Sequence, residues 1–208
     1  SGSADVLEAL GAQITLEPHK VKRRLQDAGF GFMFAQNFHP SMRFAASPRR
    51  EIAIPTVFNI LGPLTNPAGA SNQMIGVSNP NVGELMANVL RRLGTKRAVI
   101  VHGKDGLDEI TVSGDSILWI LDYSGIIKME ISPEEFGFSR SPIENIKAKD
   151  SSESALIIRN ILSGSEQGPS RDIVIMNSAV ALFCLGIVPD IQNGIQESIR
   201  SIDSGEAL

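Results

Sequence analysis

A glycine-bearing acidic segment directly follows an apolar stretch of the sequence. Residues 97–101 (RAVIV) have the composition of a buried strand, and residues 102–109 (HGKDGLDE) come next. The adjacent carboxylates of Asp108 and Glu109 offer oxygen ligands of the kind that Mg²⁺ prefers. The same segment also fits an acidic surface turn, because glycine-rich acidic turns are common. Spacing alone leaves both interpretations open and favours the turn.

Two further segments combine unusual composition with polar groups. Residues 56–67 (TVFNILGPLTNP) mix apolar residues with Gly and Pro, which indicates a buried loop that closely approaches a ligand or another element. Packing explains this segment equally well. Residues 39–43 (HPSMR) and 48–50 (PRR) bring arginines near a turn. An arginine in a pocket grips a carboxylate with two hydrogen bonds, whereas an isolated arginine more often faces water.

Several kinds of site are absent from the sequence. No Ser/His/Asp or Cys/His arrangement stands out, and three His with one Cys give no zinc spacing. Neither a Walker A loop nor a Rossmann glycine fingerprint occurs. Cys184 is the only cysteine, so no internal disulfide forms, which fits a reducing, cytoplasmic compartment. Its apolar neighbours predict a buried thiol.

The composition excludes two classes of partner. The 208 residues carry a net charge of -4, and the arginine pairs are scattered, which argues against a nucleic-acid partner. No apolar run of about 18 residues occurs, so no membrane span is expected. The start of the chain has neither a signal peptide nor an initiator Met, so we expect it to begin inside a longer protein.

The elements that position these groups follow from hydrophobic periodicity and turn residues. Residues 3–10 and 18–28 predict helices that end at Gly11 and Gly29, residues 30–34 a short strand, and residues 55–69 a loop or broken helix. A strand at 73–77, a helix from 81 or 82 to 93 and a strand at 97–101 predict a parallel βαβ unit.

The remainder of the chain predicts further strands and helices. Strands are expected at 109–112, 117–121, 126–131 and 172–176, and helices at 152–162, from Ala179 onward and at 191–202. The whole chain, residues 1–208, is therefore predicted to be one α/β domain with a mostly parallel central sheet flanked by helices. Residues 102–109 then lie at the carboxyl end of a strand, where such sheets place their ligands.

These segments together resemble anthranilate phosphoribosyltransferase. The resemblance is carried by residues 2–11 (GSADVLEALG), 39–40 (HP), 58–67 (FNILGPLTNP) and 102–109 (HGKDGLDE). Weaker matches follow in order at residues 133–137 (PEEFG), 177–179 (NSA) and 202–207 (IDSGEA). The resemblance covers essentially the whole chain and implies a fold like that of nucleoside phosphorylases and phosphoribosyltransferases.

The resemblance also implies an activity and its residues. Phosphoribose would pass from phosphoribosyl pyrophosphate to the amine of anthranilate, in tryptophan biosynthesis. Ser3 corresponds to a contact with the phosphoribosyl substrate, Arg49 to the arginine that binds the anthranilate carboxylate, and Asp108 with Glu109 to the pair that holds Mg²⁺. His39 and Pro63 correspond to residues that line the anthranilate side. A homodimer is implied for the parent protein.

The sequence also departs from the family. A helical N-terminal region, a Gly-Thr-Gly-Gly-Asp loop and a Lys-His-Gly-Asn segment, which precede residues 2–11 in the family, are not present. Because those loops bind phosphate and the helices form the dimer interface, we expect impaired activity and uncertain dimerisation for this chain alone. Smaller departures at Gln36, Arg43, Ala53 and Pro55 affect details of the pocket.

Two alternatives remain at this stage. A pyrimidine nucleoside phosphorylase shares the fold and also breaks a bond at the ribose anomeric carbon, although Arg49 and the acidic pair favour the transferase. The second alternative is a non-catalytic remnant domain, which the missing phosphate loops favour.

Overall fold

The computed structural model describes residues 2–39, 51 and 58–208 of the chain. It divides into two compact units: residues 1–67 with 148–156, and residues 68–147 with 157–208. We call them the first and the second unit. The prediction that all 208 residues form a single catalytic domain stays a prediction.

The regular elements that the structure describes in the first unit are all helices. It contains α1 (Ser3–Ala9), α2 (Pro18–Ala28), α3 (Ala35–Phe38) and α5 (Phe58–Leu64). α1 and α2 confirm the helices predicted at residues 3–10 and 18–28. α2 ends at Gly29, which adopts the left-handed conformation and donates its N–H to the Leu25 carbonyl.

The strand predicted at residues 30–34 is wrong, because these residues form no regular element. A strand is stabilised by a paired neighbour, and no described segment of this unit is a strand. The aromatic rings of Phe32 and Phe34 instead stack with their centroids 6.5 Å apart.

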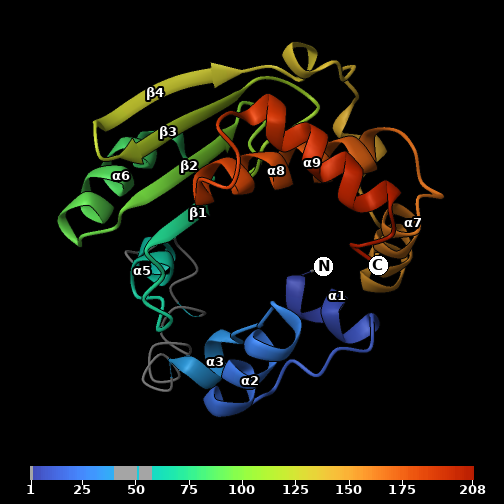
Figure 1. Cartoon of the computed structure of the whole chain (residues 1–208), viewed down its shortest axis with the longest axis horizontal. Coiled ribbons are helices and arrows are strands. Elements are labelled where there is room, and N and C mark those ends of the chain that lie inside the picture. Colours follow the sequence, from blue (N-terminus) through green and yellow to red (C-terminus); the bar gives the residue numbers. More distant parts are fainter. Residues whose placement is uncertain (1, 40–50, 52–57) are drawn as a thin grey trace. The chain divides into compact units, whose positions relative to one another are not determined.

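The second unit is built on a four-stranded sheet in the order β1-β2-β3-β4 (Figure 1). The strands are β1 (Asn72–Gly76), β2 (Arg97–Gly103), β3 (Ser116–Asp122) and β4 (Gly125–Ile131). β1 pairs with β2 in parallel, as the βαβ prediction requires. β2 with β3 and β3 with β4 are antiparallel, so the prediction of a mostly parallel sheet is wrong for the described strands.

The chain connections explain this difference. Tyr123 and Ser124 alone join β3 to β4, and such a short turn permits only antiparallel pairing. β2 and β3 are joined by residues 104–115 without a crossover helix, so the chain returns antiparallel there as well.

Helices cover both faces of the sheet, which confirms the α/β class. The short helix η2 (Pro80–Val82) leads into α6 (Gly83–Arg92) on one face, where Gly83 lies against the Trp119 ring. On the other face, buried side chains of β2 and β3 share one core with α8 (Pro169–Leu185) and α9 (Ile191–Asp203) (Figure 1). β2 is buried along nearly its whole length, so it anchors whatever follows it.

The strand predicted at residues 172–176 is wrong, because these residues lie inside α8. Their β-branched side chains suit a strand, but Pro169 opens a helix there and Gly186 ends it in the left-handed conformation. Burial of Ile175 and Met176 in the core outweighs their weak strand preference.

The remaining elements are short or lie at the boundary between the units. They are η3 (Pro133–Phe136), η4 (Ile143–Ile146) and α7 (Ser151–Leu162), of which α7 begins in the first unit and ends in the second. None of the described helices is both long and apolar enough to cross a membrane.

Candidate functional site

The acidic loop begins where β2 ends, within the second unit. His102, the penultimate residue of β2, is buried, and its Nδ1 donates to the Val77 carbonyl at 2.8 Å. This bond joins the end of β2 to the residue that follows β1. The loop therefore starts from a fixed point at the carboxyl ends of the parallel strands β1 and β2.

Asp105 holds the loop in shape from within. Its carboxylate accepts from the Leu107 backbone N–H at 3.2 Å and from the Thr111 hydroxyl. The Gly103 N–H donates to the Leu107 carbonyl at 2.8 Å, which closes the turn. Asp105 is thereby occupied with the loop's own groups, so its role is structural.

The backbone of Asp108 lies directly against the end of β1. A Cβ placed on Gly76 would come within 1.7 Å of the Asp108 carbonyl oxygen, so only glycine fits there. Gly76 and Asp108 both belong to the second unit, and their backbones pack directly against each other. It ties the first acidic residue of the loop to the sheet.

The residue after the acidic pair is held by α8. The Asn177 side chain accepts from the Ile110 N–H at 3.0 Å and donates to the Ile110 carbonyl at 2.8 Å. Ile110 itself is fully buried. The strand predicted at 109–112 is wrong, because these backbone groups bond to side chains instead of a neighbouring strand: Asn177 for Ile110 and Ser116 for the Thr111 N–H.

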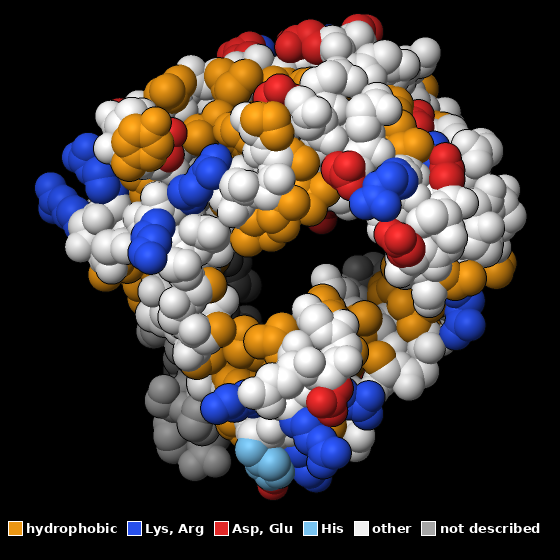
Figure 2. Space-filling model, viewed as in Figure 1, with side chains coloured by type: hydrophobic (Ala, Val, Ile, Leu, Met, Phe, Trp, Pro, Cys, Tyr) orange, Lys and Arg blue, Asp and Glu red, His pale blue; other side chains and the backbone are white. Residues whose placement is uncertain are grey.

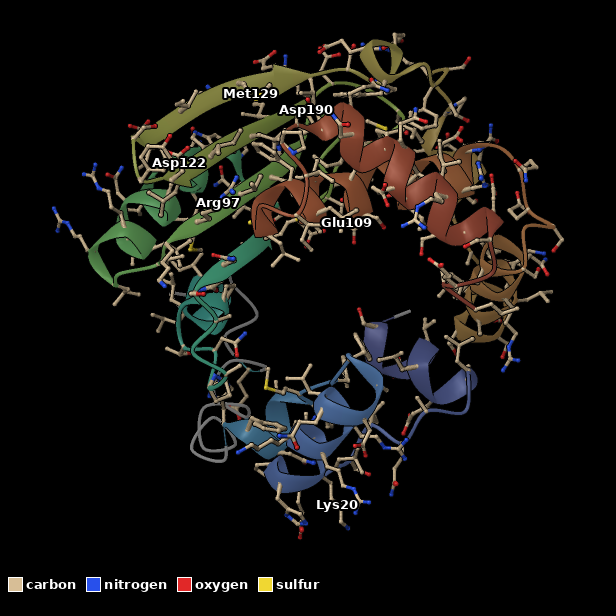
Figure 3. All side chains as sticks on the ribbon, viewed as in Figure 1. Lys20, Arg97, Glu109, Asp122, Met129 and Asp190 are labelled. Carbon is tan, nitrogen blue, oxygen red and sulfur yellow. The ribbon has the colours of Figure 1, made fainter. Side chains whose placement is uncertain are left out.

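The carboxylates of Asp108 and Glu109 take no part in these structural bonds. Both residues are exposed, and neither carboxylate has a hydrogen-bond or ion-pair partner among the residues that the structure describes. Figure 3 shows Glu109 beside α8. Desolvation of its carboxyl raises the pKa of Glu109, and the neighbouring Asp108 carboxylate raises that pKa further.

This donor set fits Mg²⁺ when a substrate supplies the remaining oxygens. Mg²⁺ is usually bound by one or two carboxylates, with water and substrate phosphates completing its shell. Within the described ranges, no three His, Cys, Asp or Glu side chains gather into a complete metal cluster. Asp108 and Glu109 alone would supply only part of the oxygen shell of a Mg²⁺ ion, and their role as its ligands stays a prediction.

Lys104, in the same motif, serves a different purpose. Its Nζ lies 2.6 Å from Glu130 and 3.6 Å from Asp115, and Arg140 bonds to Asp115 as well as to Glu134. These exposed pairs tie the loop to β4. On the face that Figure 2 shows, lysines and arginines lie in several separate places and form no continuous basic surface.

The other predicted site residues that the structure describes belong to the first unit. Ser3 is an exposed residue of the first turn of α1, His39 follows α3, and Pro63 lies inside α5, all in the first unit. Arg49 lies outside the described residues. The roles of Ser3, Arg49, His39 and Pro63 stay predictions, as do those of Asp108 and Glu109.

A comparison with protein families shows which family the chain belongs to. The profile of the glycosyl transferase family, a/b domain, matches residues 1–208, the whole chain. The chain belongs to this family.

Individual members of the family confirm the resemblance seen in the sequence. The chain is 47% identical over 208 residues to the anthranilate phosphoribosyltransferase of Rubrobacter xylanophilus and 49% identical to that of Chloroflexus aggregans; all of the chain is covered, and 61% of each relative. The crystal structure of the Thermus thermophilus anthranilate phosphoribosyltransferase matches with a TM-score of 0.92 at 40% identity, over 99% of this chain and 61% of that one.

A second structural relative carries ligands. It is the Saccharomyces cerevisiae anthranilate phosphoribosyltransferase in complex with PRPP and Mg, with a TM-score of 0.89 at 29% identity, over 100% of this chain and 58% of that one. The phosphoribosyltransferase fold is therefore confirmed. The chain spans about three fifths of the length of these relatives.

Sequence reasoning missed the residues that support the acidic pair. Asn177 was noted only within a weak three-residue match, and Gly76 was not singled out. Nothing local marks either residue, because each acts on a segment distant in sequence. The one available signal is an amide side chain in a largely apolar segment, since buried amides need partners.

Proposed function

We propose that the chain is the α/β part of an anthranilate phosphoribosyltransferase, with Asp108 and Glu109 as its Mg²⁺ ligands. The observation that carries the proposal is the pair of unpartnered carboxylates on a loop held by β1 and α8. The yeast relative in complex with PRPP and Mg supports the same chemistry. Both units belong to one catalytic domain in this proposal.

The reaction moves phosphoribose between two small molecules. The amine nitrogen of anthranilate forms a bond to the ribose anomeric carbon, the bond from that carbon to pyrophosphate breaks, and pyrophosphate leaves with the electron pair. The amine then loses a proton. No activated protein nucleophile is needed, which agrees with the absence of a catalytic triad from the sequence.

The proposal gives a role to seven residues of the chain. Asp108 and Glu109 hold Mg²⁺ through oxygen, and the bound ion would supply charge stabilisation to the leaving pyrophosphate. Ser3 contacts the phosphoribosyl substrate, and Arg49 orients anthranilate through its carboxylate, which places the amine for attack. Gly76, Asp105 and Asn177 keep the acidic loop in place.

Product formation by two proteins tests the proposal. The first is the 208-residue chain, and the second is a chimera in which the chain replaces the 208 residues it matches in the Rubrobacter xylanophilus relative. With Mg²⁺, phosphoribosyl pyrophosphate and anthranilate, we expect turnover by the chimera and little or none by the chain alone. A folded chimera without turnover would refute the proposal.

No observation in the described residues favours the pyrimidine nucleoside phosphorylase, and the relatives named above are transferases. The homodimer and the cytoplasmic location stay predictions.

A further inference from the structure

The two peptide planes on either side of Glu109 are held by different elements of the second unit. The Asp108 carbonyl belongs to the plane before Glu109, and it lies against Gly76 of β1. The Ile110 N–H belongs to the plane after Glu109, and it donates to Asn177 Oδ1 at 3.0 Å. Because peptide units are planar, fixing both planes fixes the two backbone dihedrals of Glu109 and the direction of its side chain.

Asn177 is well suited to hold the second plane. Its amide makes three hydrogen bonds, two with Ile110 and one from Nδ2 to the Ile173 carbonyl at 2.9 Å. The bond to Ile173, one turn earlier in α8, holds the Asn177 amide in the orientation in which it bonds to Ile110. The two bonds to one residue then act like a short stretch of sheet pairing, which resists rotation of the Ile110 backbone.

The supporting element is rigid. Asn177 follows Met176 on α8, and Ile175, Met176 and Ala179 are each at most 1% exposed. A side chain anchored on a buried helix holds its partner more accurately than one on a loop. Asn177 itself offers the acidic pair no charge, so its influence acts through the backbone.

We infer that Asn177 is a positioning residue for the cation site, which fixes the Glu109–Ile110 peptide so that the Asp108 and Glu109 carboxylates converge. The inference rests on the proposed function for the assignment of the cation to these two carboxylates. It predicts that the affinity of the loop for a divalent cation depends on a side chain that never contacts that cation.

Titration of the ¹⁵N-labelled 208-residue chain with Mn²⁺, followed by NMR, tests this. Bound Mn²⁺ broadens nearby amide signals, so broadening at Asp108 and Glu109 reports occupancy of the pair. Asn177→Leu preserves side-chain size and removes all three bonds. We expect it to require at least about tenfold more Mn²⁺ for the same broadening, the effect typical of losing an outer contact that orients a ligand.

Two matched controls separate positioning from general weakening. Asn88→Leu removes a comparable bond within α6, where Asn88 Nδ2 donates to the Glu84 carbonyl at 2.9 Å, far from any contact with the loop. Ile195→Val trims a buried side chain of α9 and lowers stability without removing any hydrogen bond of the loop. Both must retain wild-type Mn²⁺ affinity.

Three results would overturn the inference: wild-type affinity in Asn177→Leu, equal losses in the controls, or no broadening of the pair in the wild-type chain. Should Asn177→Leu fail to fold, hydrogen exchange of the wild-type chain decides. The Ile110 amide is expected to exchange as slowly as the α8 core, and exchange at the rate of the amide of Tyr123, a fully exposed turn residue, would refute the inference. Loss of turnover in the chimera, with the Mn²⁺ results intact, would refute the proposed reaction alone.

Discussion

The Asp108 carbonyl oxygen occupies the space next to Gly76 where any other residue would place its Cβ, at 1.7 Å from that position. The end of the parallel pair and the acidic loop are therefore in direct backbone contact. This contact and the two hydrogen bonds between Asn177 and Ile110 fix the backbone on both sides of Glu109. The sequence of the loop is that of an ordinary acidic turn, but its two carboxylates are attached to a fixed backbone.

Replacing Gly76 with alanine should therefore damage both stability and the site. The added methyl group meets backbone atoms that have no rotamer to escape into, so we expect the free energy of unfolding to fall by about 3 kcal/mol, at the upper end of overpacking effects. Urea unfolding measures this. Gly114→Ala is the control, because its Cβ would meet only Arg140 Nη1, at 3.9 Å. Equal stability of the two variants would contradict the account.

Asp105 and Thr111 should behave as one unit in a double-mutant cycle. The Thr111 hydroxyl donates to the Asp105 carboxylate, which also accepts from the Leu107 N–H. We expect Asp105→Ala to cost about 1–3 kcal/mol of unfolding free energy, since it leaves partly buried donors unpaired. Thr111→Val should cost less once Asp105 is already alanine, with a coupling of at least about 0.5 kcal/mol. Strict additivity in urea unfolding would refute the shared bond.

The raised pKa of Glu109 predicts that its ionised carboxylate lowers the stability of the fold, although the same carboxylate is needed to bind the cation. Because desolvation and Asp108 raise this pKa, the folded chain holds the Glu109 proton to a higher pH than the unfolded chain does. The free energy of unfolding therefore falls as pH rises through the window between the unfolded and the folded pKa. Above that window, ionised Glu109 destabilises the fold.

Glu109→Gln removes this penalty, so the variant should unfold at a higher temperature than the wild type at pH 7 while binding Mn²⁺ more weakly. The stability difference should shrink as pH is lowered toward about 4, the ordinary range of a glutamate pKa. Thermal unfolding at several pH values measures it. A variant that is less stable than the wild type at pH 7 would show that the Glu109 carboxylate makes a favourable contact.

The sequence allowed much of this to be predicted, for identifiable reasons. Pro18 with Gly29, and the residues that bound β1, α6 and β2, carry local signals that no tertiary contact overrides. The acidic pair was found because it follows a strand. Residues 172–176 were misassigned because burial, which sequence periodicity does not reveal, decides between helix and strand for a short β-branched run. The sequence does not indicate the role of Asn177, because that role depends on Ile110, which lies 67 positions away in the chain.

Lys104 provides a test of which residues of the acidic loop belong to the cation site. Its Nζ is held at 2.6 Å from Glu130, and this ion pair together with Asp115 raises the pKa of Lys104. We expect Lys104→Met to leave Mn²⁺ affinity unchanged at physiological salt, because the exposed Lys104 ammonium is paired with Glu130 and Asp115 and is screened by solvent. Asp108→Asn, measured beside it, should abolish the broadening. A marked loss of affinity in Lys104→Met would mean that this side chain belongs to the cation site.

The dependence of turnover on Asp108 and Glu109 tests the central claim most directly. The measurement is the Mg²⁺-dependent kcat/KM for anthranilate in the chimera with the Rubrobacter xylanophilus relative, with and without Asp108→Asn and Glu109→Gln together. We predict a loss of about 100-fold or more, comparable with removal of a main electrostatic stabiliser of a transition state. An unchanged kcat/KM in the folded double variant would contradict the assignment of these two carboxylates to the site.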